Sequence, residues 1–182
     1  TPNIEQMSTL REVYKSLKQV RLDSDANKLA TQTVGASLAL ANQYALQNNL
    51  ADAEIYYTEC LRISSDSNQP LDIKLTVLNY LFSIYVSQHR FLDADHVNHT
   101  AISLASEGSN LDKTLALINR GNLMMEQERY LEAEKIYRKC WEASVEDYSP
   151  SSTFSQNIAK LLIRSLKAQG KDAQIQEFLN PT

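Results

Sequence analysis

Glycine and proline are scarce in this chain of 182 residues, with only four of each. Both residues interrupt helices, so their scarcity, together with abundant leucine, alanine, glutamine and glutamate, favours a chain built of helices. The hydrophobic fraction of 43% is ordinary for a globular protein, and it excludes a disordered tail. We therefore expect an all-α fold.

Long apolar runs are also missing, since no stretch approaches the roughly 18 apolar residues of a membrane-spanning helix. The formal net charge of -4 excludes a generally basic nucleic-acid-binding surface. We expect neither a membrane nor a nucleic-acid partner. The first residues show no initiator methionine and no signal pattern. From this we expect a piece of a longer cytoplasmic protein whose flanking parts hold any output activity.

The sequence lacks the motifs that carry common chemistries. The four glycines are isolated, which leaves no phosphate-binding loop, and there is no Gly-x-Ser-x-Gly, His-Glu-x-x-His or Cys-x-x-Cys. No catalytic residue, cofactor or enzymatic activity is predicted. We place the acidic residues Glu132 and Glu134 on an exposed helix, where Glu134 and Arg138 form a pair that supports the helix.

Apolar residues recur instead at helical spacing along most of the chain. Helices are expected over residues 4–22, 26–47, 50–64, 71–88, 91–106, 111–127 and 130–146. A further helix is expected from a cap at 151–153 to residue 169, and a short last helix is expected to end at residue 179. Tight turns are expected at 48–49, 89–90 and 128–129. Asn48 suits such a turn because asparagine tolerates the left-handed conformation of a helix end.

The second helices of three successive pairs share small residues at matching positions. There are two such residues in each helix. The first ones are spaced by 41 and 39 residues along the chain, and the second one follows seven residues after each first one. The small residues are Ala53, Ala94 and Ala133, followed by Cys60, Ala101 and Cys140. We expect these positions to face a neighbouring helix and to let the two backbones approach closely.

Residues 119–143 carry a resemblance to a known repeat. Gly121, Tyr130, Ala133 and Cys140 fit the pattern of small and bulky positions that defines the tetratricopeptide repeat (TPR). The period of about 40 residues resembles the longer variety found in kinesin light chains and in helical sensor regions of bacterial regulators. The resemblance implies a right-handed superhelical array of antiparallel helix pairs, a TPR-like α-solenoid with a concave face.

We expect one TPR-like domain over residues 1–182. Its parts are a capping helix and the start of the first pair (1–33), repeat 1 (34–69), repeat 2 (71–110), repeat 3 (111–150) and a degenerate fourth repeat or cap (151–182). Phe82 departs from the pattern, which favours a small residue at that position. Ser37 stands where the pattern favours tryptophan, and Asn98 stands at a usually apolar position. The apolar stripe of residues 4–22 either packs on the array, which we favour, or pairs with a second chain. We therefore expect a monomer or a weak homodimer.

The repeat also predicts how far apart the two cysteines lie and whether the histidines are exposed. Cys60 and Cys140 are two repeats apart, so we expect a separation on the order of 20 Å or more and no disulfide, which needs Cα atoms within about 7 Å. His96 and His99 lie three residues apart and could place metal ligands on one face. The repeat leaves that face exposed, so a solvated polar surface is preferred and no metal site is predicted.

The resemblance implies that a partner contacts the first helix of each pair. The asparagine amides there have donors and acceptors for a peptide backbone, although they could also simply solvate the helix. Lys160, Arg164 and Lys167 share one face of a later helix and either meet an acidic peptide or remain solvated. The predicted partner-binding residues are Leu38, Asn42, Asn79, Ser83, Ile118, Asn122, Met125, Lys160 and Arg164.

Together these features predict a non-catalytic protein–protein interaction module that binds a peptide or partner helix in the concave groove. The alternative is a ligand- or peptide-sensing regulatory region of a larger signalling or transcription protein. A third, weaker possibility is self-association through residues 4–22. No cofactor or metal is expected in any of these interpretations.

Overall fold

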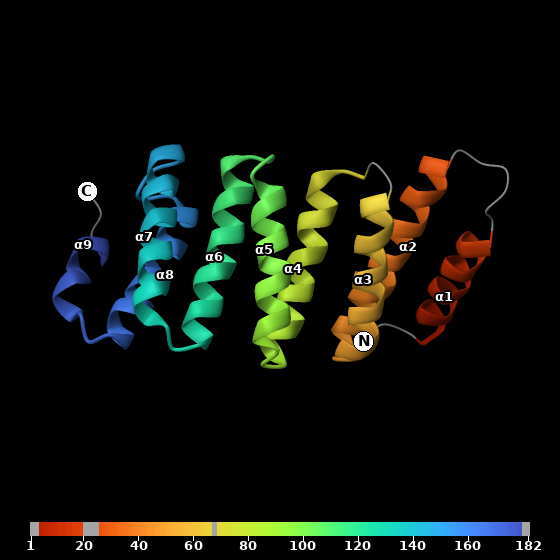
Figure 1. Ribbon diagram of the computed structural model, residues 1–182, viewed down its shortest axis with the longest axis horizontal. Coiled ribbons are helices and arrows are strands. Elements are labelled where there is room, and N and C mark those ends of the chain that lie inside the picture. Colours follow the sequence, from red (N-terminus) through yellow and green to blue (C-terminus); the bar gives the residue numbers. More distant parts are fainter. Residues whose placement is uncertain (1–3, 20–25, 67–68, 180–182) are drawn as a thin grey trace. The chain divides into compact units, whose positions relative to one another are not determined.

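The computed structural model describes residues 4–19, 26–66 and 69–179. In these ranges the regular elements are all helices, and the bounds of α2–α9 lie within two residues of those expected (Figure 1). They are α1 (Ile4–Gln19), α2 (Ala26–Leu46), α3 (Leu50–Asp66), α4 (Leu71–Ser87), α5 (Phe91–Ala105), α6 (Asn110–Glu126), α7 (Tyr130–Asp147), α8 (Thr153–Ala168), the 3-10 turn η1 (Asp172–Gln174) and α9 (Gln176–Leu179). The all-α prediction is confirmed. None of these described helices combines the length and apolar character needed to cross a membrane.

A few predictions lie outside the described residues. These are residues 20–22 of the first expected helix and residues 1–3, 23–25, 67–68 and 180–182 of the expected domain. The side chains of Ile4 and Met7 are not described either.

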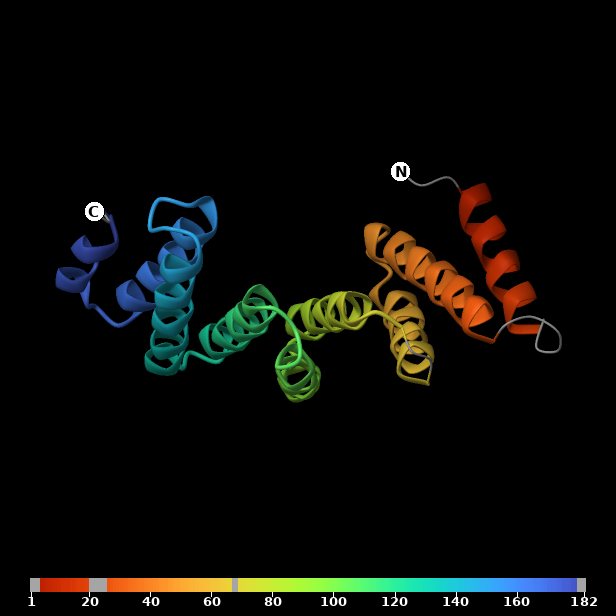
Figure 2. The ribbon, with the colours of Figure 1, turned by 90° about the horizontal axis from the view of Figure 1, so that it is seen from above.

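The chain divides into two compact units, residues 1–88 and 89–182, and each is described by itself. In the first unit α2 and α3 form an antiparallel pair, α1 packs on α2, and α4 packs on α3 (Figure 2). In the second unit α5 packs on α6, α6 on α7 and α7 on α8. The division falls between α4 and α5, inside the segment predicted as repeat 2.

Three turns place a non-glycine residue in the left-handed region. Asn48 and His89 have φ of 57°, and Glu128 has φ of 59°. At the ends of α2 and α6 the turn is closed by a backbone hydrogen bond. Asn49 N donates to the Tyr44 carbonyl at 2.9 Å, and Arg129 N donates to the Met124 carbonyl at 2.8 Å. Left-handed backbone is uncommon outside glycine, so its recurrence at spacings of 41 and 39 residues is direct structural support for the repeat.

The small residues predicted to permit close helix packing are all buried. Those of the first set, Ala53, Ala94 and Ala133, have no exposed surface. Cys60 and Cys140 are buried free thiols. Burial raises the pKa of Cys60 to about 11 and that of Cys140 to about 12. Both thiols therefore stay protonated near neutral pH and act as packing residues.

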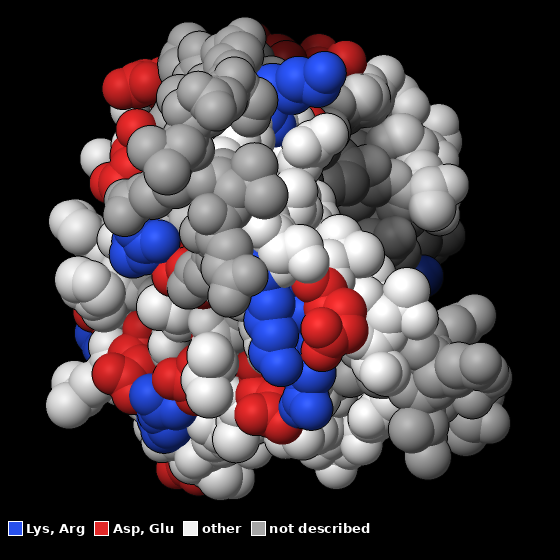
Figure 3. All heavy atoms as spheres, turned by 90° about the vertical axis from the view of Figure 1, so that its right-hand side faces the viewer, with Lys and Arg blue, Asp and Glu red and all other residues white. Residues whose placement is uncertain are grey.

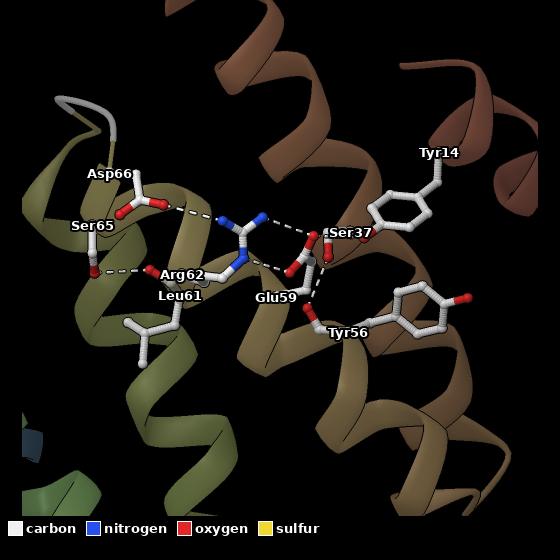
Figure 4. A network of polar contacts seen from close by, with 8 residues as sticks. All are labelled: Tyr14, Ser37, Tyr56, Glu59, Leu61, Arg62, Ser65 and Asp66. Atoms are coloured by element: carbon white, nitrogen blue, oxygen red, sulfur yellow. Dashed lines mark hydrogen bonds and ion pairs between the residues drawn. The ribbon is translucent and has the colours of Figure 1, made fainter. Parts of the chain in front are cut away.

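Polar contacts fasten α1 and α2 to α3 in the first unit (Figure 4). The Tyr14 hydroxyl donates to Glu59 Oε1 at 3.1 Å, and Arg62 Nε donates to Glu59 Oε2 at 2.8 Å. Ser37 is fully buried and donates its hydroxyl to the Tyr56 carbonyl at 2.8 Å. Ser37 stands where the TPR pattern favours tryptophan, and this hydrogen bond accounts for a small polar residue at the α2–α3 contact.

Helix α1 covers one end of the first unit. Its Tyr14 is buried, and its Arg11 donates to the Tyr44 hydroxyl of α2. Glu12 and Lys15 are exposed and form an ion pair of 3.5 Å. In Figure 3, which shows this side of the molecule, basic and acidic side chains lie next to each other without a large patch of one sign. A mixed polar outer face is what the end of a helical array requires.

Candidate partner-binding surface

Two of the predicted asparagines hold buried tyrosines. The Tyr57 hydroxyl donates to Asn42 Oδ1 at 2.6 Å, and the Tyr137 hydroxyl donates to Asn122 Oδ1 at 2.7 Å. Both rings are 1% exposed, and burial raises the pKa of both hydroxyls, so they remain neutral donors. The described hydrogen bonds use only the amide oxygens. The N–H groups of Asn42 and Asn122 are thus left as donors for a partner.

Gly121 makes room for one of these tyrosines. A Cβ atom on Gly121 would lie 2.5 Å from Tyr137 Cε1, which is too close for two carbon atoms. The Tyr137 ring therefore crosses α6 at Gly121, and the next residue, Asn122, receives its hydroxyl. In the first unit the corresponding residues are Ala41, which is fully buried, and Asn42. The small residue of the TPR pattern thus has a defined steric role in α6.

Repeat 2 has no such asparagine–tyrosine pair. The residues at the matching sequence positions are Ser83 and Asn98. Ser83 is exposed and donates its hydroxyl to the carbonyl of Asn79 at 3.0 Å. Asparagine at the first of these positions and tyrosine at the second are thus present together or missing together. This pattern indicates that the asparagine is retained partly for the tyrosine, a role that the sequence analysis did not anticipate.

A small apolar hollow lies among α2, α3 and α4 of the first unit, with a volume of about 190 Å³. Two of its walls are the stacked rings of Tyr57 and Tyr80, whose centroids are 5.0 Å apart at an interplanar angle of 17°. Its lining residues are Ala45, Leu50, Tyr57, Tyr80, Ser83, Ile84 and Ser87. The lining includes the predicted Ser83 and carries no charged side chain, so this hollow is the candidate site of the first unit.

Sequence reasoning missed Tyr80, which is 42% exposed despite its large ring. A signal was available, because Tyr80, Ser83, Ile84 and Ser87 have the spacing of a single helical face. The exposed ring of Tyr80 on the same face as the predicted Ser83 makes this face of α4 a candidate binding surface. The TPR pattern does not include this position.

The other predicted residues of the first helices are less accessible. Leu38 and Ile118 are half-buried. Met125 is 8% exposed, so a partner could touch only a small part of its side chain. The structure places all three mainly in the helix packing.

On α8, Lys160 and Arg164 are both exposed. Lys160 Nζ donates to Asn157 Oδ1 at 3.3 Å. Burial raises the pKa of Tyr137, and the nearby positive charge of Arg164 opposes that shift. Arg164 therefore lies close to the pair formed by Tyr137 and Asn122. Of the residues predicted in the second unit, Arg164 and Asn122 thus lie near the same tyrosine.

The placement of Glu134 on an exposed helix face is wrong. Glu134 is 7% exposed, and Lys171 Nζ and Gln169 Nε2 donate to its Oε2 at 2.7 and 3.0 Å. Arg138 forms the expected ion pair with its Oε1 at 3.3 Å. Burial acts to raise the pKa of Glu134, but these hydrogen bonds outweigh it and the net shift is downward. The error arose because the segment after α8 covers this position, and no repeat pattern predicts that segment.

The Glu134 network makes stability depend on acid pH. Because its folded pKa is lowered, the contribution of Glu134 is complete above its unfolded pKa and is lost as the pH falls through the folded pKa. We expect Glu134→Gln to lower the free energy of unfolding at pH 7 by about 1–2 kcal/mol, a discounted figure because its cationic partners are partly exposed. Urea titrations at several pH values should show that the difference from wild type shrinks below about pH 4.

Glu132→Gln is the matched control for this substitution. Glu132 is exposed and pairs with Arg129 at 2.6 Å on the open surface, where ion pairs contribute little. We expect almost no change in its urea midpoint. Equal effects of the two substitutions would contradict the assignment of a buried network to Glu134.

The histidine pair considered as a metal site is solvated. His96 and His99 are both exposed on α5. Over residues 4–19, 26–66 and 69–179 there is no group of three or more His, Cys, Asp or Glu side chains that could hold a metal ion.

Comparison with known proteins defines the class of the fold. No protein-family model matches the sequence, and no curated protein matches it significantly. Solved structures do match: BtubC (BKLC) from P. vanneervenii has a TM-score of 0.75 at 14% identity, covering 96% of this chain and 69% of that chain. A putative kinesin light chain from Podosopora anserina with nearly identical TPR-like repeats has a TM-score of 0.69 at 12% identity, covering 96% of this chain and 85% of that chain.

A point variant of the same P. anserina protein also has a TM-score of 0.69 at 12% identity, and the match covers 97% of this chain and 94% of that chain. These likenesses show that the fold is a TPR-like α-solenoid. The predicted resemblance to the long-repeat TPR variety is thereby confirmed. At identities this low the comparison extends to the fold alone.

Proposed function

We propose that this chain is a non-catalytic protein–protein interaction module that binds a peptide segment or partner helix through the first helices of its repeats. The observation that carries the proposal is the apolar hollow among α2, α3 and α4. It contains a residue predicted from the TPR resemblance, Ser83. One of its walls is Tyr57, which Asn42 holds in place.

The size of the hollow favours a peptide over a small molecule. Its volume of about 190 Å³ is below the roughly 300–1,000 Å³ of small-molecule pockets. An apolar cavity of about 150 Å³ can hold one benzene ring. The hollow therefore fits a single apolar side chain of a peptide, and this supports the interaction module over the sensing of a small ligand.

Polar groups near each site would position the peptide backbone. The amide N–H groups of Asn42 and Asn122 are donors for peptide carbonyls, which are the same in every sequence. In the second unit Lys160 and Arg164 would attract acidic groups of the partner. In this proposal, apolar recognition belongs to the first unit and acidic recognition to the second.

Filling the hollow tests the proposal. Ser83 is exposed and its side chain bonds only to its own helix, so Ser83→Trp should fold normally while its indole occupies the hollow. We expect the affinity for a captured partner to fall at least roughly tenfold, since losing a central anchor costs about 2 kcal/mol or more and about 1.4 kcal/mol is tenfold. Affinity capture followed by titration calorimetry of the retained partner would measure the change.

Ile55→Trp is the matched control because Ile55 is 61% exposed on α3 and does not line the hollow. It should leave the affinity unchanged. If Ser83→Trp binds the partner as tightly as Ile55→Trp does, the hollow is not the binding site.

A further inference from the structure

The chain folds back on itself after α8. Gly170, with φ of 70°, ends that helix, and Lys171 N donates to the Leu166 carbonyl at 3.0 Å. Residues 170–179, which we call the C-terminal strap, then form η1 and α9 beside α7 and α8 (Figure 1). Ile175 and Phe178 are the buried apolar side chains described in the strap.

The strap is attached to α7 at two points. At the first, Lys171 Nζ pairs with the buried carboxylate of Glu134 at 2.7 Å. At the second, the Phe178 ring meets the Trp141 ring edge-to-face, with centroids 5.0 Å apart. Arg138 joins the two points, because it pairs with Glu134 and lies 5.3 Å above the Phe178 ring.

The α7 face under the strap has a chemistry of its own. Glu134 is a nearly buried carboxylate, so whatever covers it must supply a cation. Trp141 Nε1 is buried and has no hydrogen-bond acceptor among the described residues. The strap therefore supplies a cation to Glu134 and an aromatic ring to Trp141. It supplies no described hydrogen-bond acceptor to the indole N–H of Trp141. A better-fitting segment would gain a hydrogen bond that the strap does not make.

The strap also contains little regular structure. Its described α-helix is four residues long, which is too short to be stable alone. Segments with few buried contacts open locally without unfolding the rest. The strap can thus leave α7 while the packing of α6, α7 and α8 is kept.

We propose that Glu134, Arg138 and Trp141 form a second docking site, filled in cis by the strap, for a partner segment that carries a lysine or arginine and, seven residues later, an aromatic residue. The spacing is that of Lys171 and Phe178. Charge complementarity to Glu134 selects the basic residue, and the edge of Trp141 selects the aromatic one. This site is separate from the hollow of the first unit and does not depend on the function proposed there.

Trp141 is the only tryptophan of the chain, so its fluorescence reports on the strap directly. In the full chain, Lys171→Ala/Phe178→Ala should shift the emission to longer wavelength because water reaches the indole. Circular dichroism would confirm that the helices remain. Phe154→Ala is the matched control, since it removes an equivalent ring that packs edge-to-face on Tyr148, and it should not move the emission.

The probe is a synthetic peptide of residues 170–179, which contains no tryptophan. We expect it to restore the emission of the double variant saturably, and to bind wild type at least roughly tenfold more weakly because the tethered strap competes. A peptide with Lys171→Glu should not bind. Lys171→Glu in the full chain is the second variant, to be used if the double variant fails to fold, and it should also bind the wild-type peptide.

Three results would overturn the proposal. The first is an unchanged emission in the strap variants, and the second is a shifted emission that the peptide does not restore. The third is light scattering that shows a wild-type dimer dissociated by the peptide, which would make the occupant the strap of a second copy. Loss of binding at the hollow of the first unit would not bear on any of these readouts.

Discussion

Replacing Gly121 with alanine is expected to lower the free energy of unfolding by about 1–3 kcal/mol, the usual cost of overpacking a core. Alanine is normally the better helix former by about 1 kcal/mol, so a loss is contrary to propensity. The reason is the Tyr137 ring, which lies 2.5 Å from the position of the new Cβ atom. Urea unfolding followed by circular dichroism would measure the change.

Gly35→Ala is the control, because Gly35 also lies within a helix but its Cβ position has nothing within 4 Å. This substitution should stabilise the protein by about 0.5–1 kcal/mol. The two alanines should thus have opposite signs. If both stabilise the chain, the Tyr137 ring can move at little cost and the close approach has no structural role.

Tyr137→Ala is expected to have the largest effect, a loss of about 3–5 kcal/mol, as for other large buried rings. The ring is 1% exposed and fills the space beside Gly121. Removing it leaves a cavity between α6 and α7 and deprives Asn122 of its hydroxyl partner. Thermal and urea unfolding of the purified variant would measure the loss.

Tyr137→Phe separates the ring from the hydroxyl. We expect it to cost only about 0.5–1.5 kcal/mol, the net contribution of one hydrogen bond. Tyr57→Phe should behave alike, because Tyr57 donates to Asn42 with the same geometry. A loss in Tyr137→Phe as large as in Tyr137→Ala would mean that the hydrogen bond, and not the ring, carries the packing of this repeat.

Most of the helical framework could be predicted from the sequence. Apolar spacing predicts the bounds of α2–α9 within two residues, because the stripe that a helix buries is repeated at each turn. The turns were predictable for a similar reason. Glu128 is not a residue that favours left-handed backbone, yet it adopts a φ of 59° in the turn expected between the two amphipathic helices.

The candidate site was less predictable, because neighbouring segments decide it. The sequence marks Asn42 and Asn122 as surface amides, yet it does not show that each oxygen already accepts from a tyrosine 15 residues later. Glu134 fails for the same reason, since Lys171 reaches it from 37 residues away. Helical spacing describes one helix at a time and carries no information on such partners.

Two departures from the TPR pattern also have partners on another helix that the sequence does not show. Ser37 replaces a favoured tryptophan, and the structure explains it by the hydrogen bond to the Tyr56 carbonyl. Asn98 stands at a usually apolar position, and its amide donates to the Ala116 carbonyl at 3.0 Å while its oxygen has no described partner. Each polar residue thus joins two helices, although the repeat pattern alone treats it as a mismatch.

The central claim is that a partner peptide binds at the apolar hollow of the first unit. Photocrosslinking tests it most directly, with a photoreactive amino acid placed either at Tyr80 in the hollow or at Ile55, which is 61% exposed on α3 and does not line it. We predict that position 80 crosslinks to a partner peptide with an apolar side chain at the joined site, and that position 55 gives no product. Crosslinks from position 55 and none from position 80 would contradict the claim.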